Sequence, residues 1–103
     1  MKKIEKDGKV AILVSPGFGA GWSTWNSEVR ESMCMNAEIV QAVLDGDTDR
    51  AAEIAERLHP NVYTGGSRDL VVEWVPKGEA FEITEYDGSE GLVIVSKQTY
   101  MIA

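Results

Sequence analysis

The sequence predicts an α+β fold in which one small mixed or antiparallel sheet, of about four strands, packs against a helical hairpin. Three observations predict it: an apolar run before Ser15, two amphipathic segments in the middle of the chain, and short alternating segments in the second half. Because 103 residues is the usual length of one domain, we expect residues 1–103 to form a single α+β domain.

The first predicted strand covers residues 10–14, Val-Ala-Ile-Leu-Val. An unbroken apolar run is typical of a strand that is covered on both faces, so we expect this one in the centre of its sheet. Pro16 ends the strand, since proline has no N–H for the ladder. In residues 27–35 we expect a short helical turn that brings Met33 and Met35 to the core.

Two helices are predicted over residues 37–44 and about 48–58, joined tightly at Gly46. Asn36 is the expected N-cap of the first helix, and Pro60 follows the end of the second. Their apolar faces comprise Ile39, Val40, Val43 and Leu44 in the first helix and Ala51, Ile54, Ala55 and Leu58 in the second. Glu53 and Arg57 have the spacing of an i,i+4 ion pair.

The second half of the chain is rich in strand signals. Residues 70–75, 81–86 and 92–95 are predicted strands, and the last two form a hairpin around a turn at residues 87–91. A short edge strand is expected at residues 98–102.

The net charge of −7 argues against a nucleic-acid polymer as partner, because binding a polyanion needs clustered basic side chains. The four lysines at positions 2, 3, 6 and 9 alternate with acidic residues and indicate a solvated end. A small anionic ligand is still compatible with this charge, since backbone N–H groups bind anions without any basic patch.

The expected location is the cytoplasm, with no membrane as partner. No apolar run approaches the length of about 20 residues that spans a bilayer, and residues 1–9 lack the apolar core of a signal peptide. The single cysteine, Cys34, excludes an internal disulfide framework. A domain of this size buries a modest core, so association with a second copy is a natural way to cover apolar surface.

Residues 15–26, Ser-Pro-Gly-Phe-Gly-Ala-Gly-Trp-Ser-Thr-Trp-Asn, form the most informative segment. Glycines after a strand invite comparison with phosphate-binding loops. Trp22, however, occupies the position of the third glycine of the dinucleotide-binding fingerprint and of the second glycine of a P-loop. Both standard phosphate loops are therefore excluded, although alternating glycines still allow a nest of open backbone N–H groups.

The sequence disfavours catalysis. Its only histidine, His59, lies at a predicted helix end, where interaction with the helix dipole explains it better than a role as base. Ser23 lacks the setting of a nucleophile elbow, and one His with one Cys makes a zinc site improbable. We therefore expect no enzyme activity, no metal and no cofactor. A small enzyme that uses carboxylates and Ser23 ranks last among the hypotheses.

The same segment predicts a binding site for a nucleotide-like molecule. Trp22 and Trp25 are three residues apart, so one helical turn would place both on the same side and allow them to stack on a base or sugar. The alternative is that these aromatic residues close the core. The candidate ligand-binding residues are Gly17, Phe18, Gly19, Gly21, Trp22, Ser23, Thr24, Trp25, Asn26, Tyr63 and Arg68.

Several strings of the sequence resemble a family of small uncharacterised proteins encoded by bacteriophages and prophages. They are the Pro16–Asn26 segment, Tyr-Thr-Gly-Gly at 63–66, Glu-Trp-Val-Pro-Lys-Gly at 73–78 and the stretch from Phe81 to Glu90. The resemblance spans about Val10 to Glu90 and implies no known activity, so no catalytic role is carried over. It implies a context in which small accessory proteins counter host defences, some of them by sequestering nucleotide signals.

Two functions follow as hypotheses. In the first, the protein sequesters a nucleotide-like small molecule, at the interface of a homo-oligomer if one forms. In the second, it is a protein-interaction module that regulates a host or phage protein through exposed Trp22 and Trp25 and an acidic surface.

Overall fold

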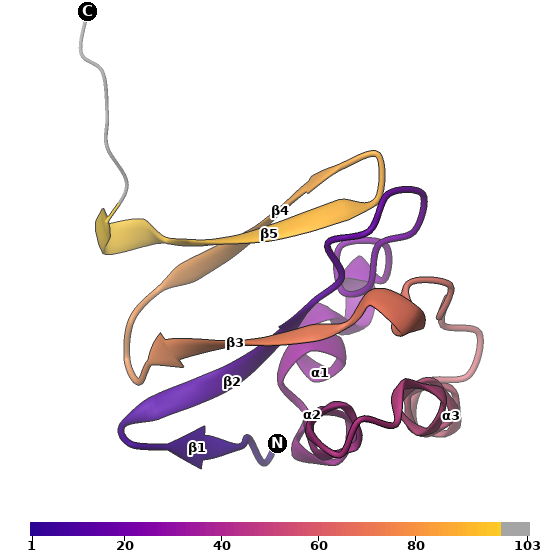
Figure 1. The fold of residues 1–103 in the computed structure, drawn as a ribbon, viewed down its shortest axis with the longest axis horizontal. Coiled ribbons are helices and arrows are strands. Elements are labelled where there is room, and N and C mark those ends of the chain that lie inside the picture. Colours follow the sequence, from indigo (N-terminus) through magenta and orange to yellow (C-terminus); the bar gives the residue numbers. More distant parts are fainter. Residues whose placement is uncertain (98–103) are drawn as a thin grey trace, which may run out of the picture.

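Strand β2 (Lys9–Val14) lies at the centre of a three-stranded sheet, between β1 (Glu5–Lys6) and β3 (Val71–Pro76). The computed structural model describes residues 1–97 (Figure 1). Both strand pairs are antiparallel, with Val10 opposite Val75 and Val14 opposite Val71. The predicted central position of the first apolar strand is confirmed.

Strand β1 is an element that the sequence analysis missed. Asp7 and Gly8 have positive φ angles of 53° and 76° and form the two-residue turn between β1 and β2. An Asp-Gly pair is the usual signal for this hairpin turn, because both central residues need a positive φ. The lysines of this region are exposed, as expected for a solvated end.

Strands β4 (Phe81–Tyr86) and β5 (Ser89–Ile94) form a separate two-stranded antiparallel sheet. Strand β5 begins three residues before the predicted Leu92, because the turn consists of only Asp87 and Gly88, with φ angles of 50° and 86°. Residues 1–97 thus form two sheets where the sequence predicted one. The predicted edge strand at residues 98–102 lies outside the described residues.

Three α-helices separate β2 from β3: α1 (Arg30–Met35), α2 (Ala37–Leu44) and α3 (Thr48–Leu58). Short 3-10 turns precede α1 (η1, Ser27–Val29) and β3 (η2, Ser67–Asp69), and a third follows β5 (η3, Val95–Lys97). The side chain of Asn36 caps α2 by accepting from the N–H of Glu38 at 3.0 Å. The predicted helical hairpin of α2 and α3 is confirmed.

Two side chains on these helices depart from the predicted pattern. Leu44 is 43% exposed, and Ala42 takes its place in the buried face of α2. Arg57 pairs with Glu38 of α2 and not with Glu53 one turn away in its own helix. This ion pair joins α2 to α3. The guanidinium of Arg57 therefore makes a contact between helices, whereas the sequence predicted an i,i+4 contact within α3.

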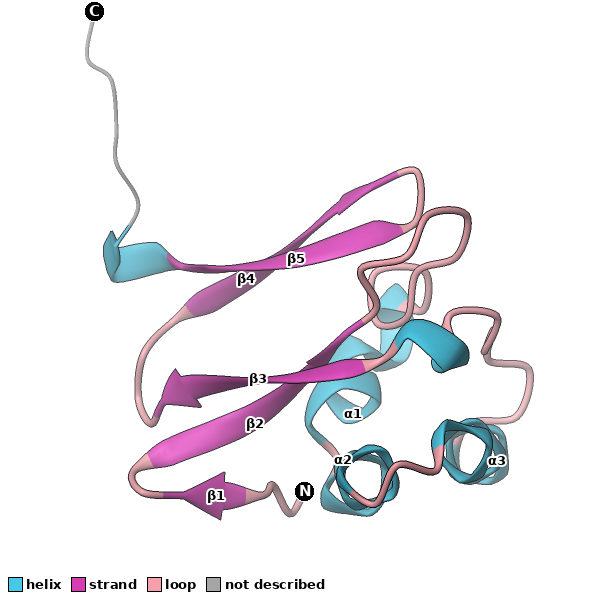
Figure 2. Cartoon of the chain, in the orientation of Figure 1, coloured by secondary structure: helices cyan, strands magenta, loops and turns pink. Residues whose placement is uncertain are grey.

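The molecule has three layers, with the β1–β2–β3 sheet between the helices and the β4–β5 hairpin (Figure 2). Ala11 and Leu13 pack with the helical residues, whereas Ile12 packs with Phe81 and Leu92 of the hairpin. Successive side chains of a strand point to opposite faces, so both faces of β2 are covered. The α+β class is confirmed, and the two core faces explain the unbroken apolar run.

No helix within residues 1–97 combines the length and apolar character that crossing a membrane requires.

Candidate functional site

Residues 15–26 leave the end of β2 and fold around one buried carboxylate, that of Glu90 on β5. Glu90 is only 4% exposed. Its Oε1 accepts from the N–H of Ser15 at 2.9 Å, and its Oε2 accepts from the N–H groups of Trp22 at 2.9 Å and Thr24 at 3.0 Å. The Thr24 hydroxyl donates to the same Oε2 at 2.5 Å. We call Ser15, Trp22, Thr24 and Glu90 the Glu90 cluster.

The Glu90 cluster shows what the backbone N–H groups of the glycine-rich segment bind. Burying an ionised carboxylate costs several kcal/mol unless donors satisfy it. Among the side chains of residues 1–96 no cation pairs with Glu90, so the backbone N–H groups and one hydroxyl supply this compensation. The sequence predicted open N–H groups for a ligand anion. In the structure, an internal anion engages those of Ser15, Trp22 and Thr24.

The loop also hydrogen-bonds directly to the turn of the β4–β5 hairpin. The Gly19 N–H donates to the Asp87 carbonyl at 2.7 Å, and the Glu90 N–H donates to the Ser15 carbonyl at 2.9 Å. The Ser89 hydroxyl donates to the Pro16 carbonyl at 2.7 Å. The Pro-Gly-Phe-Gly segment and the Asp-Gly-Ser-Glu turn, more than 60 residues apart in the chain, are therefore one structural unit.

The second glycine loop, residues 63–68, lies against the same segment. The Ser15 hydroxyl donates to the Gly66 carbonyl at 2.8 Å. The Asn26 amide nitrogen donates to the carbonyls of Trp22 at 2.7 Å and Tyr63 at 2.8 Å, and its oxygen accepts from the Tyr63 N–H at 2.9 Å. The rings of Trp25 and Tyr63 lie 5.5 Å apart at a tilt of 31°. The structure thus brings together Trp25, Asn26 and Tyr63 from the candidate set.

Trp22 does not lie beside Trp25, and the expectation that one helical turn aligns them is wrong. Residues 21–26 form bends and a turn. Trp22 is 0% exposed, and its indole N–H donates to the Met33 carbonyl at 2.6 Å, whereas Trp25 is 42% exposed. The core-packing alternative therefore holds for Trp22. Ser23 is likewise buried, at 2% exposure, so the segment presents neither the indole of Trp22 nor most of Ser23 to solvent.

Two further aromatic side chains are far more exposed. Phe18 is 75% exposed on the loop, and Tyr86 is 78% exposed at the end of β4. Gly19 follows Phe18 and Asp87 follows Tyr86, and the hydrogen bond from the Gly19 N–H to the Asp87 carbonyl joins the two segments. Arg68 is exposed in η2 and forms no ion pair with the side chains of residues 1–96.

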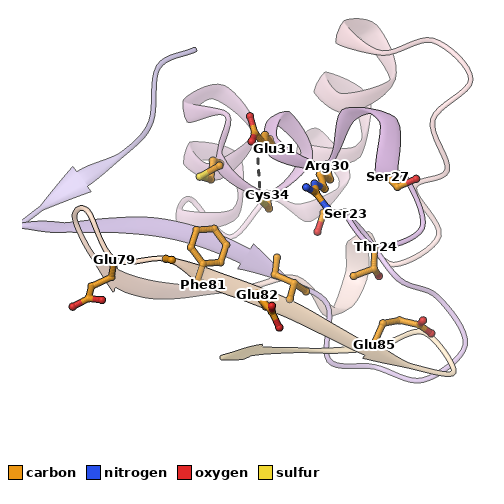
Figure 3. A pocket seen from close by; sticks show the side chains of 13 residues that line it. Ser23, Thr24, Ser27, Arg30, Glu31, Cys34, Glu79, Phe81, Glu82 and Glu85 are labelled. Carbon is orange, nitrogen blue, oxygen red and sulfur yellow. Dashed lines mark hydrogen bonds between the residues drawn. The ribbon is translucent and has the colours of Figure 1, made fainter. Parts of the chain in front are cut away.

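A groove of about 800 Å³ lies between α1 and β4 (Figure 3). Its lining includes one arginine, Arg30, and four glutamates, Glu31, Glu79, Glu82 and Glu85. Cys34, Met35, Phe81 and Ile83 supply apolar lining. Only Ser23 and Thr24 of the predicted site residues reach it. The sequence analysis missed this groove because its two walls come from segments about 50 residues apart, and no local motif marks it.

Cys34 lies in this groove as a buried thiol, 4% exposed. Burial raises the pKa of Cys34 to about 12; a backbone hydrogen bond opposes this effect, and the nearby negative charges of Glu90 and Glu31 add to it. A thiol with this pKa stays protonated at neutral pH and is a poor nucleophile. The groove therefore does not contain an activated cysteine.

His59 is at the C-terminal end of α3, as predicted, and its Nε2 lies 2.6 Å from the Ser32 hydroxyl. No other side chain of residues 1–96 hydrogen-bonds to the His59 ring, so among these residues the pair lacks the third group that orients a catalytic base. Among the same residues, no three His, Cys, Asp or Glu side chains gather as a metal site would require.

Comparison with protein-family models, with curated proteins and with solved structures finds no match for this chain. The resemblance to phage-encoded proteins stays a prediction from the sequence.

The Glu90 cluster can be tested with Glu90→Gln. Glutamine keeps the size of the side chain but removes the charge and replaces one acceptor oxygen with an NH₂ group that faces N–H donors. Buried hydrogen bonds to charged groups contribute about 1.5–3 kcal/mol each. We therefore expect the free energy of unfolding, measured in urea, to fall by at least about 2 kcal/mol. The matched control is Glu53→Gln, at an exposed position of α3. Equal effects of the two substitutions would contradict a structural role for the buried carboxylate.

The packing of the loop on the hairpin turn can be tested with Gly88→Ala. A Cβ at position 88 would lie 2.8 Å from the Gly19 carbonyl carbon and closer still to the Ala20 nitrogen. Gly78 has a similar φ, 89° against 86°, but a Cβ there meets nothing within 4 Å. We expect Gly78→Ala to cost about 1 kcal/mol through its dihedral angle alone and Gly88→Ala to cost at least twice that. Thermal unfolding of both variants gives the comparison, and similar melting temperatures would refute the tight contact.

The protonated state of Cys34 has a pH-dependent consequence. The folded-state pKa of about 12 lies above the value of 9.0 for an unperturbed cysteine thiol, so the stabilisation is complete below pH 9 and is lost as the pH rises towards 12. We expect stability to fall over this window by about 1 kcal/mol per pH unit more in the wild type than in Cys34→Ala. Urea unfolding at pH 8, 10 and 11 measures it. Parallel pH profiles of the two proteins would show that the thiol is not shielded.

Proposed function

We propose that this protein is a protein-interaction module, and that its binding surface is the set of exposed aromatic side chains Phe18, Trp25, Tyr63 and Tyr86. We call this set the aromatic end. The loops that carry it lie at one end of the molecule, beyond the end of β2 (Figure 1). The observation that supports the proposal most strongly is that these large side chains are 42–78% exposed although their backbones are held by hydrogen bonds.

Aromatic side chains on a fixed backbone are well suited to protein recognition. They bury a large area at a small cost in conformational entropy, and they are enriched among the residues that dominate binding energy. Phe18 and Tyr86 are attached to the loop and turn that the Glu90 cluster joins. Trp25 and Tyr63 are joined through the Asn26 amide. The aromatic end would therefore meet a partner already ordered, which lowers the entropic cost of binding.

Sequestration of a nucleotide-like molecule has less support. The hypothesis depended on open N–H groups and on two stacking tryptophans. The N–H groups of Ser15, Trp22 and Thr24 donate to Glu90, that of Gly19 donates to Asp87, and Trp22 is buried. The groove next to the segment has one arginine against four glutamates, a charge that repels phosphate.

The resemblance to phage-encoded proteins makes a host protein the expected partner, met in the cytoplasm of the host cell. The chain's net charge of −7 favours a partner with a basic surface around its binding site. In this proposal the protein acts by binding alone, without turnover, and needs no cofactor.

The proposal can be tested by affinity capture from a bacterial lysate with three forms of the protein. The double variant Phe18→Ala/Tyr86→Ala removes exposed aromatic rings, and Leu44→Ala/Val71→Ala removes apolar side chains of 43% and 44% exposure elsewhere. We expect the first variant to lose a partner at least tenfold, a typical effect of truncating interface hot spots, and the second to retain it. Equal recovery by all three forms would refute the proposal. Sedimentation of the purified protein reveals whether the partner is a second copy of the chain.

A further inference from the structure

Strand β4 lines the acidic groove, and one of its two edges is free among the described residues. The Val95 N–H donates to the Ala80 carbonyl at 2.9 Å, which identifies Ala80 and Val95 as a hydrogen-bonded pair of the ladder. Bonded and non-bonded pairs alternate along an antiparallel ladder. The N–H and C=O groups of Phe81, Ile83 and Glu85 therefore point away from β5, and within residues 1–97 no other strand pairs with them.

The groove beside this edge combines an apolar lining with a strong negative charge. Phe81 of β4 lies across it from Cys34 of α1 (Figure 3), and Ile83 and Met35 add to the apolar lining. None of the four lining glutamates takes part in an ion pair with another side chain of residues 1–96. The groove has four carboxylates and one arginine, and unpaired backbone groups of β4 lie next to them. A ligand of this groove must therefore carry positive charge and backbone hydrogen-bonding groups.

We propose that this groove binds an extended, lysine- or arginine-rich peptide segment, which adds to the edge of β4 as a third strand. Main-chain hydrogen bonds to Phe81, Ile83 and Glu85 would hold the backbone of the segment. Alternate side chains of the peptide would point towards the apolar lining and towards the carboxylates, because a strand presents its side chains to two faces. The six residues of β4 offer a length of about 20 Å, enough for a strand of similar size.

Charge complementarity selects this occupant over a second copy of the chain. A second copy would bring its own net charge of −7 to an acidic edge, and charged edges are a known protection against such pairing. A small polycation would satisfy the glutamates but would leave the unpaired N–H and C=O groups of β4 without partners. The proposed peptide site lies apart from the aromatic end, since none of Phe18, Trp25, Tyr63 and Tyr86 lines the groove.

The test uses a fluorescein-labelled heptapeptide, Lys-Val-Lys-Val-Lys-Val-Lys, titrated with the full chain while fluorescence anisotropy is measured. A second peptide carries N-methyl groups on alternate residues, which keeps its charge but removes the N–H donors of one edge, and a third has Glu in place of Lys. We expect saturable binding of the first peptide, at least tenfold weaker binding of the second and no binding of the third. Equal binding of the first two, or binding of neither, would overturn strand addition.

Variants of the protein locate the site. Glu79→Lys/Glu82→Lys reverses two charges of the groove, and Glu53→Lys/Glu73→Lys reverses two exposed charges that do not line it. We expect the first pair to weaken peptide binding by about tenfold and the second to change it less than threefold, with circular dichroism confirming that both fold. Equal effects would overturn the assignment to this groove.

Hydrogen exchange gives a readout that charge attraction alone would not produce. In the complex, we expect slower exchange of the Phe81, Ile83 and Glu85 amides, and unchanged rates there would overturn the proposal. The Phe18→Ala/Tyr86→Ala variant should bind the peptide like the wild type. The peptide site and the aromatic end can therefore fail independently of each other.

Discussion

The buried carboxylate of Glu90 is the constraint on which the loops of this protein depend. It has no cationic partner among the side chains of residues 1–96, so its oxygens require the N–H groups of Ser15, Trp22 and Thr24. Meeting that requirement closes residues 15–24 into one path, which directs the indole of Trp22 into the core. This path carries Phe18 of the aromatic end and brings Ser23 and Thr24 to the acidic groove. The two surfaces proposed above would thus both depend on one buried charge.

Elements whose signals are local could be predicted well from the sequence. The helix over residues 37–44 was predicted within its observed bounds because its cap at Asn36 and its apolar spacing lie within a few residues of one another. Strand β4 was predicted in the same way from its alternation. Strand β1 was missed although Asp7 and Gly8 carried its turn signal, because two residues are too few for an alternation pattern. The division into two sheets depends on nonlocal pairing, which no local pattern encodes.

The sequence pointed to residues 15–26 as the candidate site but did not reveal which group accepts their hydrogen bonds. Glycines and tryptophans indicated backbone donors and aromatic surface, yet the acceptor is Glu90, 75 residues from Ser15. One signal was available: Glu90 is in phase with Leu92 and Ile94, so the alternation of β5 directs its carboxylate towards the core. A charged residue on the apolar side of a strand requires a dedicated set of donors. The acidic groove had no such signal, because helix α1 and strand β4 form it only in the folded chain.

The distance in sequence between Ser15 and Glu90 also bears on how the protein is made. During synthesis the glycine-rich loop leaves the ribosome long before β5, so its N–H groups stay hydrated until the acceptor arrives. The helical hairpin, built from local contacts, can form in the meantime. Burial of Trp22 would then follow the arrival of β5, and its fluorescence would report a late step of folding and not the first. A nascent chain of this design would order its glycine-rich loop only after β5 has been translated.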